Sequence, residues 1–217
     1  MATLPQSKLE KVKHLYYTKK YSMKAIGQVY AVSLDCVAYF MRKNDLKRRT
    51  LAEEQKLRFE NKIPSFTLKR RNKDTEELNA IGAMLYWGEG YKGDKENPAN
   101  MVDFTNSDPE MISLFLRFLR NTFDLNKSKF RILLYCYSDQ DVGKLITFWS
   151  DLTGIERSLF IKPYIRKDFR IGGRKMKYGL IHIRYHDKKL LLELKKMIDS
   201  YKSKYTRQSN SGNFTTL

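Results

Sequence analysis

The chain is poor in cysteine and proline, has few acidic residues for its size, and contains no long apolar run. Its two cysteines, Cys36 and Cys136, show no CxxC spacing among 217 residues, which favours reduced thiols in a cytosolic protein. No apolar segment reaches the roughly 20 residues that a membrane-spanning helix needs. The N-terminus MATLPQSKLEK has none of the features of a signal peptide. We therefore expect a cytoplasmic protein without a membrane partner.

The shortage of acidic residues leaves a large positive charge. Only 24 Asp and Glu stand against 42 Lys and Arg, for a net charge of +18. The excess is greatest in residues 1–75, and a second basic concentration runs from Arg157 to Lys189. Such a charge indicates a polyanionic partner, with nucleic acid as the first candidate and a nucleoid-associated location. The 41% of hydrophobic residues can form packed cores, so a disordered basic protein is excluded.

The N-terminal segment predicts three short helices. Ser22 and Ser33 are suitable N-caps for the second and third helices, and only Ala31 and Val32 lie between these two. Two helices joined by so short a turn are typical of a helix-turn-helix domain. Its recognition helix would present one face to a DNA major groove: Leu34, Asp35, Ala38, Tyr39 and Arg42. Basic residues that follow would lie near phosphates: Lys43, Lys47, Arg48 and Arg49. The alternative is a trihelical packing module, but the net charge favours DNA binding.

A charged connector separates this segment from a larger domain. Thr50 and Glu53 form a capping box for a short helix that must end before Pro64, and Asp74 with Glu77 repeats the signal. The tail is polar, and we expect it to be disordered. The sequence thus predicts a helix-turn-helix domain, a basic helical linker, a larger domain and a tail, at residues 1–49, 50–74, 75–204 and 205–217.

Three strand–helix units fill the larger domain. They are VDFTNSDPEMISLFLRFLRNTF, FRILLYCYSDQDVGKLITFWSDLTG and IHIRYHDKKLLLELKKMIDSYKSKY. The segment FIKPYIRKDFRIGGRKMKYGLIHIRY predicts a β-hairpin that turns at Gly172-Gly173. We therefore predict an α+β domain with helices on one face of a mainly antiparallel sheet.

Alternation along these strands sorts their residues onto an apolar face and a polar face. Basic, tyrosine and histidine side chains of the strands and the hairpin are predicted to bind DNA: Arg131, Tyr135, Tyr137, Arg166, Arg170, Arg174, Lys175, His182 and Arg184. Such a surface can hold phosphates and read base edges. The alternative is a solvated sheet face that is basic without a ligand.

Acidic residues at the strand–helix junctions have an ordinary explanation. Asp108, Asp139 and Asp187 each stand where a strand ends and a helix begins, which indicates helix capping. His182 and His186 are four residues apart on a strand, or about 13 Å, so a shared metal is not expected.

Glu89 stands at a position where an acidic residue is unusual. AIGAMLYWGEGYKGD places Glu89 between Gly88 and Gly90 at the end of an apolar helix, where the helix dipole disfavours an acid. A divalent cation would compensate for it, because hard cations bind carboxylate oxygens. The alternative is an exposed Glu just past the helix, with the glycines as its C-cap.

These residues resemble a known family. AMLYWGEG resembles the end of the LAGLIDADG homing-endonuclease motif, with Gly88-Glu89-Gly90 at its small residue, acid and Gly. VDFTNSDPEMISLFLRFL resembles that fold's strand and second helix, and the resemblance covers about residues 75–204. The helix-turn-helix with RRTLAEEQKLRFENKIPSF resembles the front of a group of uncharacterised bacterial and archaeal proteins. The family fold implies an αββαββα-type domain.

The resemblance also implies a function. In that family the motif helices of two copies pack together, and their acids bind divalent metal against the scissile phosphates. One motif copy here implies a homodimer on a roughly two-fold site, with Glu89 as the metal ligand and catalytic residue and Mg²⁺ as the cofactor of an active nuclease. The implied dimer contacts are Ala83, Met84, Tyr86, Trp87 and Gly88.

The sequence leaves two uses of this design open. A retained acid favours a DNA endonuclease, a phosphodiester hydrolase. Bulky Met84 and Trp87 near close-packing positions, and a catalytic base that cannot be mapped, favour a transcription regulator that binds DNA without cleaving it. No aromatic RNP-type motif is present, which argues against RNA. In both cases the expected partner is double-stranded DNA.

Overall fold

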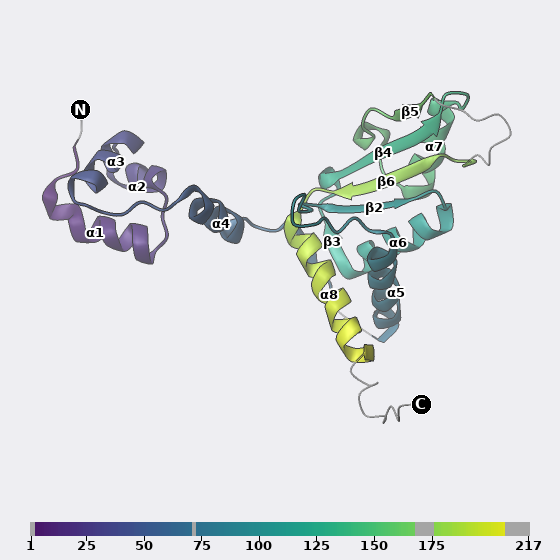
Figure 1. Ribbon diagram of the computed structural model, residues 1–217, viewed down its shortest axis with the longest axis horizontal. Helices are drawn as coiled ribbons and strands as arrows, with labels where there is room; N and C mark the ends of the chain where they lie inside the picture. Colours follow the sequence, from purple (N-terminus) through teal and green to yellow (C-terminus); the bar gives the residue numbers. More distant parts are fainter. Residues whose placement is uncertain (1–2, 71–72, 168–175, 207–217) are drawn as a thin grey trace, which may run out of the picture. The chain divides into compact units, whose positions relative to one another are not determined.

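The structure is a computed structural model that describes residues 3–70, 73–167 and 176–206 (Figure 1). It is an α+β protein, as the sequence predicts. The chain divides into two compact units, Met1–Ile63 and Pro64–Leu217. In the part of the chain that the structure describes, every helix is too short or too polar to cross a membrane.

The first unit is helical. Its elements are a 3₁₀ turn (Gln6–Lys8), α1 (Leu9–Lys13) continued by a π-helical turn (His14–Thr18), α2 (Met23–Tyr30), α3 (Leu34–Lys43) and α4 (Leu51–Asn61). Both predicted serine caps are present. Ser22 Oγ accepts a hydrogen bond from Ala25 N, and Ser33 Oγ accepts one from Cys36 N, each at 3.1 Å.

A tight turn joins α2 to α3. Ala31 adopts a left-handed conformation (φ 53°) at the C-cap of α2, and Val32 N donates to Gly27 O at 2.9 Å. A Cβ at Gly27 would lie 2.7 Å from Val32 O, so a larger residue there would push the turn away from the helix. The three helices enclose one small core. Its buried members are Leu4, Val12, Tyr16, Ile26, Val37, Phe40 and Met41.

The segment predicted to be a linker is divided between the units. Thr50 and Glu53 form the predicted capping box of α4, with Thr50 N donating to Glu53 Oε2 at 2.7 Å. This helix belongs to the first unit, and none of its residues is buried. Strand β1 (Phe66–Leu68) belongs to the second unit, where it pairs with β3 (Phe123–Leu125). The last residue of β1, Leu68, is also the first residue of the basic segment LKRRNK.

The second unit packs helices against a four-stranded sheet (Figure 1). Its other strands are β2 (Val102–Asn106), β4 (Phe130–Tyr137), β5 (Tyr164–Arg166) and β6 (Leu180–Tyr185). Its helices are α5 (Lys73–Glu89), α6 (Pro109–Thr122), α7 (Val142–Thr153) and α8 (Lys188–Thr206), with 3₁₀ turns at Lys127–Lys129 and Arg157–Leu159. The strand order is β2-β6-β4-β5, in which β6 is antiparallel to both neighbours.

The predicted hairpin is wrong. β5 pairs with β4, in parallel, and β6 lies between β2 and β4, so β5 and β6 are not neighbours. The approach to β5 follows the free edge of β4, where Ile161 N donates to Ile132 O at 2.9 Å. Because β6 satisfies the hydrogen bonds of two strands at once, it occupies the centre of the sheet rather than a hairpin edge. The proposed turn at Gly172-Gly173 lies outside the described residues.

The predicted alternation of faces is confirmed. Along β4 every second residue is buried, beginning with Phe130, and along β6 the same holds from Ile181. These residues share one core with α5, α6, α7 and α8. α5 and α6 approach closely because Gly82 faces Phe118, where a Cβ would lie 2.0 Å from the ring.

The order of elements departs from αββαββα. Between α5 and α6 only β2 joins the main sheet, and Gly90 makes an isolated bridge to Phe104. Asp108 caps α6 as predicted, with Oδ1 accepting from Glu110 N at 2.8 Å. The cap of α7 is Asp141 instead of Asp139, and Asp187 accepts from Lys189 N at the start of α8.

Candidate nucleic-acid interface

One face of α3 is available for contact. The helix turns Val37, Phe40 and Met41 into the core of the first unit. The opposite side carries the predicted contact residues, of which all but the half-buried Ala38 are exposed: Leu34, Asp35, Ala38, Tyr39 and Arg42. The Arg42 guanidinium lies 5.8 Å from the centre of the Tyr39 ring. We call this set the exposed α3 face.

The structure corrects the role of Arg49. Its guanidinium donates through Nε to Glu54 at 3.1 Å, through one terminal nitrogen to Tyr16 O at 3.0 Å, and through the other to Tyr21 O. It also lies over the Tyr16 ring, 3.9 Å from its centre. With 11% of its side chain exposed, Arg49 joins the start of α4 to the helical core instead of facing a phosphate. Lys43, Lys47 and Arg48 are exposed.

A groove beside α3 gathers most of the remaining positive charge of the first unit. It has a volume of about 1300 Å³ and lies between the Lys19–Ala25 segment, the start of α3 and α4. Its lining contains one acid, Glu54, and seven basic residues: Lys19, Lys20, Lys24, Arg48, Arg49, Arg58 and Lys62. Glu54 is already paired with Arg49, so it does not neutralise the others. We call this the basic groove.

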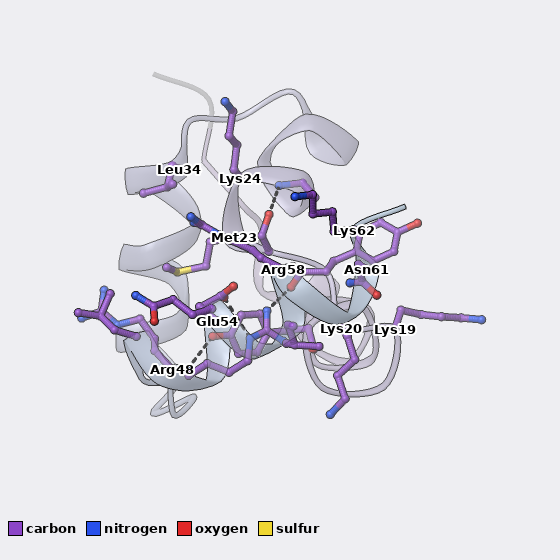
Figure 2. A pocket seen from close by; sticks show the side chains of 18 residues that line it. Lys19, Lys20, Met23, Lys24, Leu34, Arg48, Glu54, Arg58, Asn61 and Lys62 are labelled. Atoms are coloured by element: carbon purple, nitrogen blue, oxygen red, sulfur yellow. Dashed lines mark hydrogen bonds and ion pairs between the residues drawn. The ribbon is translucent and has the colours of Figure 1, made fainter. Parts of the chain in front are cut away.

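Figure 2 shows how the cations of the basic groove are distributed. The side chains of Lys19, Lys20 and Lys24 extend outward in different directions, while Glu54 lies on the inner side. Leu34 stands at the boundary between the groove and the exposed α3 face, so the two surfaces are continuous. A polyanion with regularly spaced charges matches this arrangement better than a single small anion.

The second unit carries a polar surface on the sheet, opposite its core. Here Asp103 and Thr105 of β2 stand beside Arg184 and His182 of β6, their register partners. β4 adds Arg131, Leu133, Tyr135 and Tyr137, and β5 adds Tyr164 and Arg166. We call these residues the polar sheet face.

Four side chains of this face form one hydrogen-bonded network. Asp103 is 7% exposed. Its Oδ1 lies 2.9 Å from His182 Nδ1, and its Oδ2 accepts from Arg184 Nε at 2.9 Å. Thr105 Oγ1 lies 2.8 Å from the same His182 nitrogen. Asp103 therefore fixes the orientation of the imidazole and guanidinium groups.

The pKa of Asp103 reflects its contacts with His182 and Arg184. Burial raises the pKa of Asp103, but the hydrogen bond and charge of His182 and the charge of Arg184 outweigh it, so the pKa lies below its usual range. Partial burial, together with the charges of Arg131, Arg184 and Lys129, lowers the pKa of His186.

Two arginines of the sheet that were predicted to bind DNA make hydrogen bonds within the chain. Arg131 donates to the carbonyls of Ser128 and Phe130, and Arg184 is held by Asp103. Arg166 is exposed at the end of β5. Arg170, Arg174 and Lys175 lie outside the described residues.

Glu89 is the last residue of α5, and its side chain is exposed. A Cβ at Gly90 would lie 2.4 Å from the Tyr86 ring, so this glycine is explained by contact within the chain. At Gly88, by contrast, a Cβ would meet open space. Among residues 3–70, 73–167 and 176–206, no three His, Cys, Asp or Glu side chains come together as a metal site would require.

Two of the five implied dimer contacts are not at the surface. Ala83 and Tyr86 are completely buried in the core of their own unit, because their positions on α5 face α6 and β2. Met84 is half-buried, and Trp87 is 46% exposed with Lys202 Nζ 4.8 Å from its ring. Ile81, which the resemblance does not include, is also exposed and shares a helix face with Met84 and Gly88.

Several residues of these surfaces are not in the predicted set. The lysines of TKKYSMK flank the Ser22 cap, and this cluster in the sequence could have indicated the basic groove. The Asp103–His182 contact joins residues 79 positions apart, and only the register of β2 and β6 brings them together. Tyr164 was assigned to a hairpin, which concealed its place beside Tyr135.

Known proteins add no further assignment. Comparison of the chain with protein-family models, with curated proteins and with solved structures finds no match.

Proposed function

We propose that the protein binds double-stranded DNA through the exposed α3 face, with the basic groove on the adjoining phosphates. The observation that supports this most directly is the continuity of the two surfaces at Leu34. An α-helix fits the DNA major groove, and a tightly joined helix pair presents its second helix there. Tyr39 and Arg42 then reach base edges, while Lys20, Lys24 and Arg58 neutralise phosphates.

The polar sheet face is a second DNA contact in this proposal. Its arginines and tyrosines supply donors and flat rings on a surface of strands, and its Asp103 is neutralised within its own network. Charge on both units accounts for the overall value of +18.

Selection from a randomised duplex library with the full chain tests the proposal. We expect enrichment of a defined sequence. Arg42→Ala should relax its specificity at one position, whereas Lys20→Gln should weaken binding to all sequences and reduce the salt slope by about one. Failure to enrich any sequence, or affinity that does not change with salt, would contradict the proposal.

The biological use that fits best is regulation without cleavage, because Ala83 and Tyr86, two of the implied contacts between copies of α5, are buried within their own unit. A metal-dependent nuclease is the second candidate. It is favoured by the open space at Gly88 and the exposed Ile81 and Trp87, which allow two copies of α5 to meet and bring two Glu89 carboxylates together.

A cleavage assay separates the two uses. The full chain is incubated with its selected duplex, with Mg²⁺ or with EDTA. Cuts that require Mg²⁺ and disappear in Glu89→Gln would establish the nuclease, with the metal held by two copies of Glu89 and supplying Lewis-acid chemistry at the phosphate. Binding without cuts in either condition is the result expected of a regulator.

A further inference from the structure

Three aromatic rings lie in a row across the polar sheet face. The ring centres of His182 and Tyr135 are 5.0 Å apart, and those of Tyr135 and Tyr164 are 4.9 Å apart. The rings stand on β6, β4 and β5 in turn. Tyr164 is the register partner of Tyr135, and His182 is its diagonal neighbour across β4 and β6. We call this row the aromatic ladder.

The inner end of the ladder is fixed. His182 is held through Nδ1 by Asp103 and Thr105, and Asp103 is held in turn by Arg184. A ring fixed in this way loses little conformational entropy when a ligand stacks against the ladder.

The outer end of the ladder is open. Tyr164 is 55% exposed, and beside it lies a hollow of about 690 Å³, a size that suits small aromatic ligands. Three tyrosines and two cations line the hollow: Tyr135, Tyr137, Tyr164, Arg166 and Lys167. The rest of its described lining is apolar or thiol, without a carboxylate: Cys136, Ile165, Met176 and Leu180.

The chemistry of the hollow selects a planar ring that carries a negative charge. Tyrosine faces stack with flat aromatic groups, and Arg166 with Lys167 attracts an anion. A nucleotide combines both properties. Bases inside a duplex have both faces covered by their neighbours, so only an unpaired base can present a face to the ladder.

We propose that the aromatic ladder and its hollow bind an unpaired nucleotide of a DNA strand, with the base stacked on Tyr164 and its phosphate at Arg166 and Lys167. This rests on the proposed function, and it extends it to sites where a strand end or an extruded base adjoins the duplex. Removing a stacking aromatic weakens binding by roughly 5- to 150-fold per base.

The test uses the full chain and two probes, a blunt duplex and the same duplex with a single-stranded overhang that contains 2-aminopurine. Fluorescence anisotropy gives the affinity for each, and quenching of 2-aminopurine reports stacking. Tyr164→Leu removes the ring, Tyr164→Phe retains it, and Tyr205→Leu makes the same change at a tyrosine that is 64% exposed on α8. Circular dichroism checks that each variant is folded.

We expect the overhang to bind at least fivefold more tightly than the blunt duplex, with quenched 2-aminopurine, in the wild type, Tyr164→Phe and Tyr205→Leu. Tyr164→Leu should lose both effects, and its affinity for the blunt duplex should fall by less than its affinity for the overhang, because α3 and the basic groove still bind the duplex. An overhang without advantage in the wild type, or an advantage that survives Tyr164→Leu, would overturn the inference. Competition by free deoxynucleotide without any overhang advantage would also overturn it.

The experiment distinguishes a failure of the aromatic-ladder proposal from a failure of the proposed duplex binding by α3. Loss of the overhang effect with intact blunt-duplex binding removes only the aromatic ladder as a site. Overhang binding without blunt-duplex binding removes only the proposed duplex recognition by α3.

Discussion

Arg48 and Arg49 are neighbours in sequence with opposite roles, and exchanging each for alanine tests that difference. Arg49→Ala removes donors to Tyr16 O, Tyr21 O and Glu54 together with the cation over the Tyr16 ring. Arg48→Ala removes one exposed charge from the basic groove. We expect the first variant to lose stability and the second to lose DNA affinity.

The expected loss of stability follows from the burial of the pair. Removing one partner of a buried ion pair costs about 3–5 kcal/mol, and the partial exposure of Glu54 (21%) places Arg49→Ala near the lower end, at about 3 kcal/mol. At roughly 0.05–0.15 kcal/mol per residue, a 63-residue unit has about 3–9 kcal/mol in total. A loss of about 3 kcal/mol then lowers its Tm by roughly 12 °C or more.

Two optical signals separate the units in this assay. Trp87 and Trp149, the two tryptophans of the chain, both belong to the second unit, so tryptophan fluorescence follows that unit alone. Far-ultraviolet circular dichroism follows both. In Arg49→Ala we expect an early loss of helical signal while the fluorescence transition stays in place. Arg48→Ala should leave both transitions within about 0.5 kcal/mol of the wild type and weaken DNA binding.

One result would refute the reasoning. If Arg49→Ala leaves both transitions unchanged and weakens DNA binding as much as Arg48→Ala does, Arg49 faces the phosphates and the anchor that joins α4 to the helical core does not exist in solution.

Further predictions concern the second unit. Asp103→Asn should cost about 2–3 kcal/mol at neutral pH, measured by urea unfolding, because Arg184 and His182 lose a charged partner. Since the folded-state pKa of Asp103 is lowered, its contribution is complete above about pH 4 and disappears as the pH falls through the folded-state value, so the two proteins should converge in acid; a constant difference would contradict the assignment. Gly82→Ala should destabilise by about 1–3 kcal/mol, since its methyl group collides with Phe118. Gly88→Ala, on the same helix, should be neutral or stabilising by up to about 1 kcal/mol, and a drop in dimer content by light scattering would place Gly88 between two copies of α5.

The sequence was sufficient where local chemistry decides the structure. Ser22 and Ser33 cap their helices because a serine hydroxyl satisfies a free backbone donor of the first turn, whatever surrounds it. The faces of β4 follow from alternation alone, since successive side chains must point to opposite sides. The same reasoning identified the side of α3 that carries Tyr39 and Arg42.

Arg49 shows where such reasoning ends. Nothing in KRRT distinguishes one arginine from the next, and the difference depends on where the carbonyls of Tyr16 and Tyr21 lie after α1 ends. The prediction of a β-hairpin was wrong for a related reason. Turn residues between two apolar runs predict that the two runs pair with each other in the sheet. In the structure β5 instead forms its hydrogen bonds with the free edge of β4, and the local sequence does not indicate this pairing.

The wrong β5–β6 pairing also explains why the aromatic ladder was not predicted from the sequence. With β5 and β6 paired as a hairpin, Tyr164 would stand beside a residue of β6, and Tyr135 would have no aromatic neighbour on its outer side. With β5 along β4, Tyr164 stands opposite Tyr135, while β6 on the other side of β4 brings His182 to the same ring. The aromatic ladder therefore depends on strand order rather than on the spacing of aromatic residues. A substitution that releases β5 from the edge of β4 should abolish stacking of an unpaired base even if all three rings are retained.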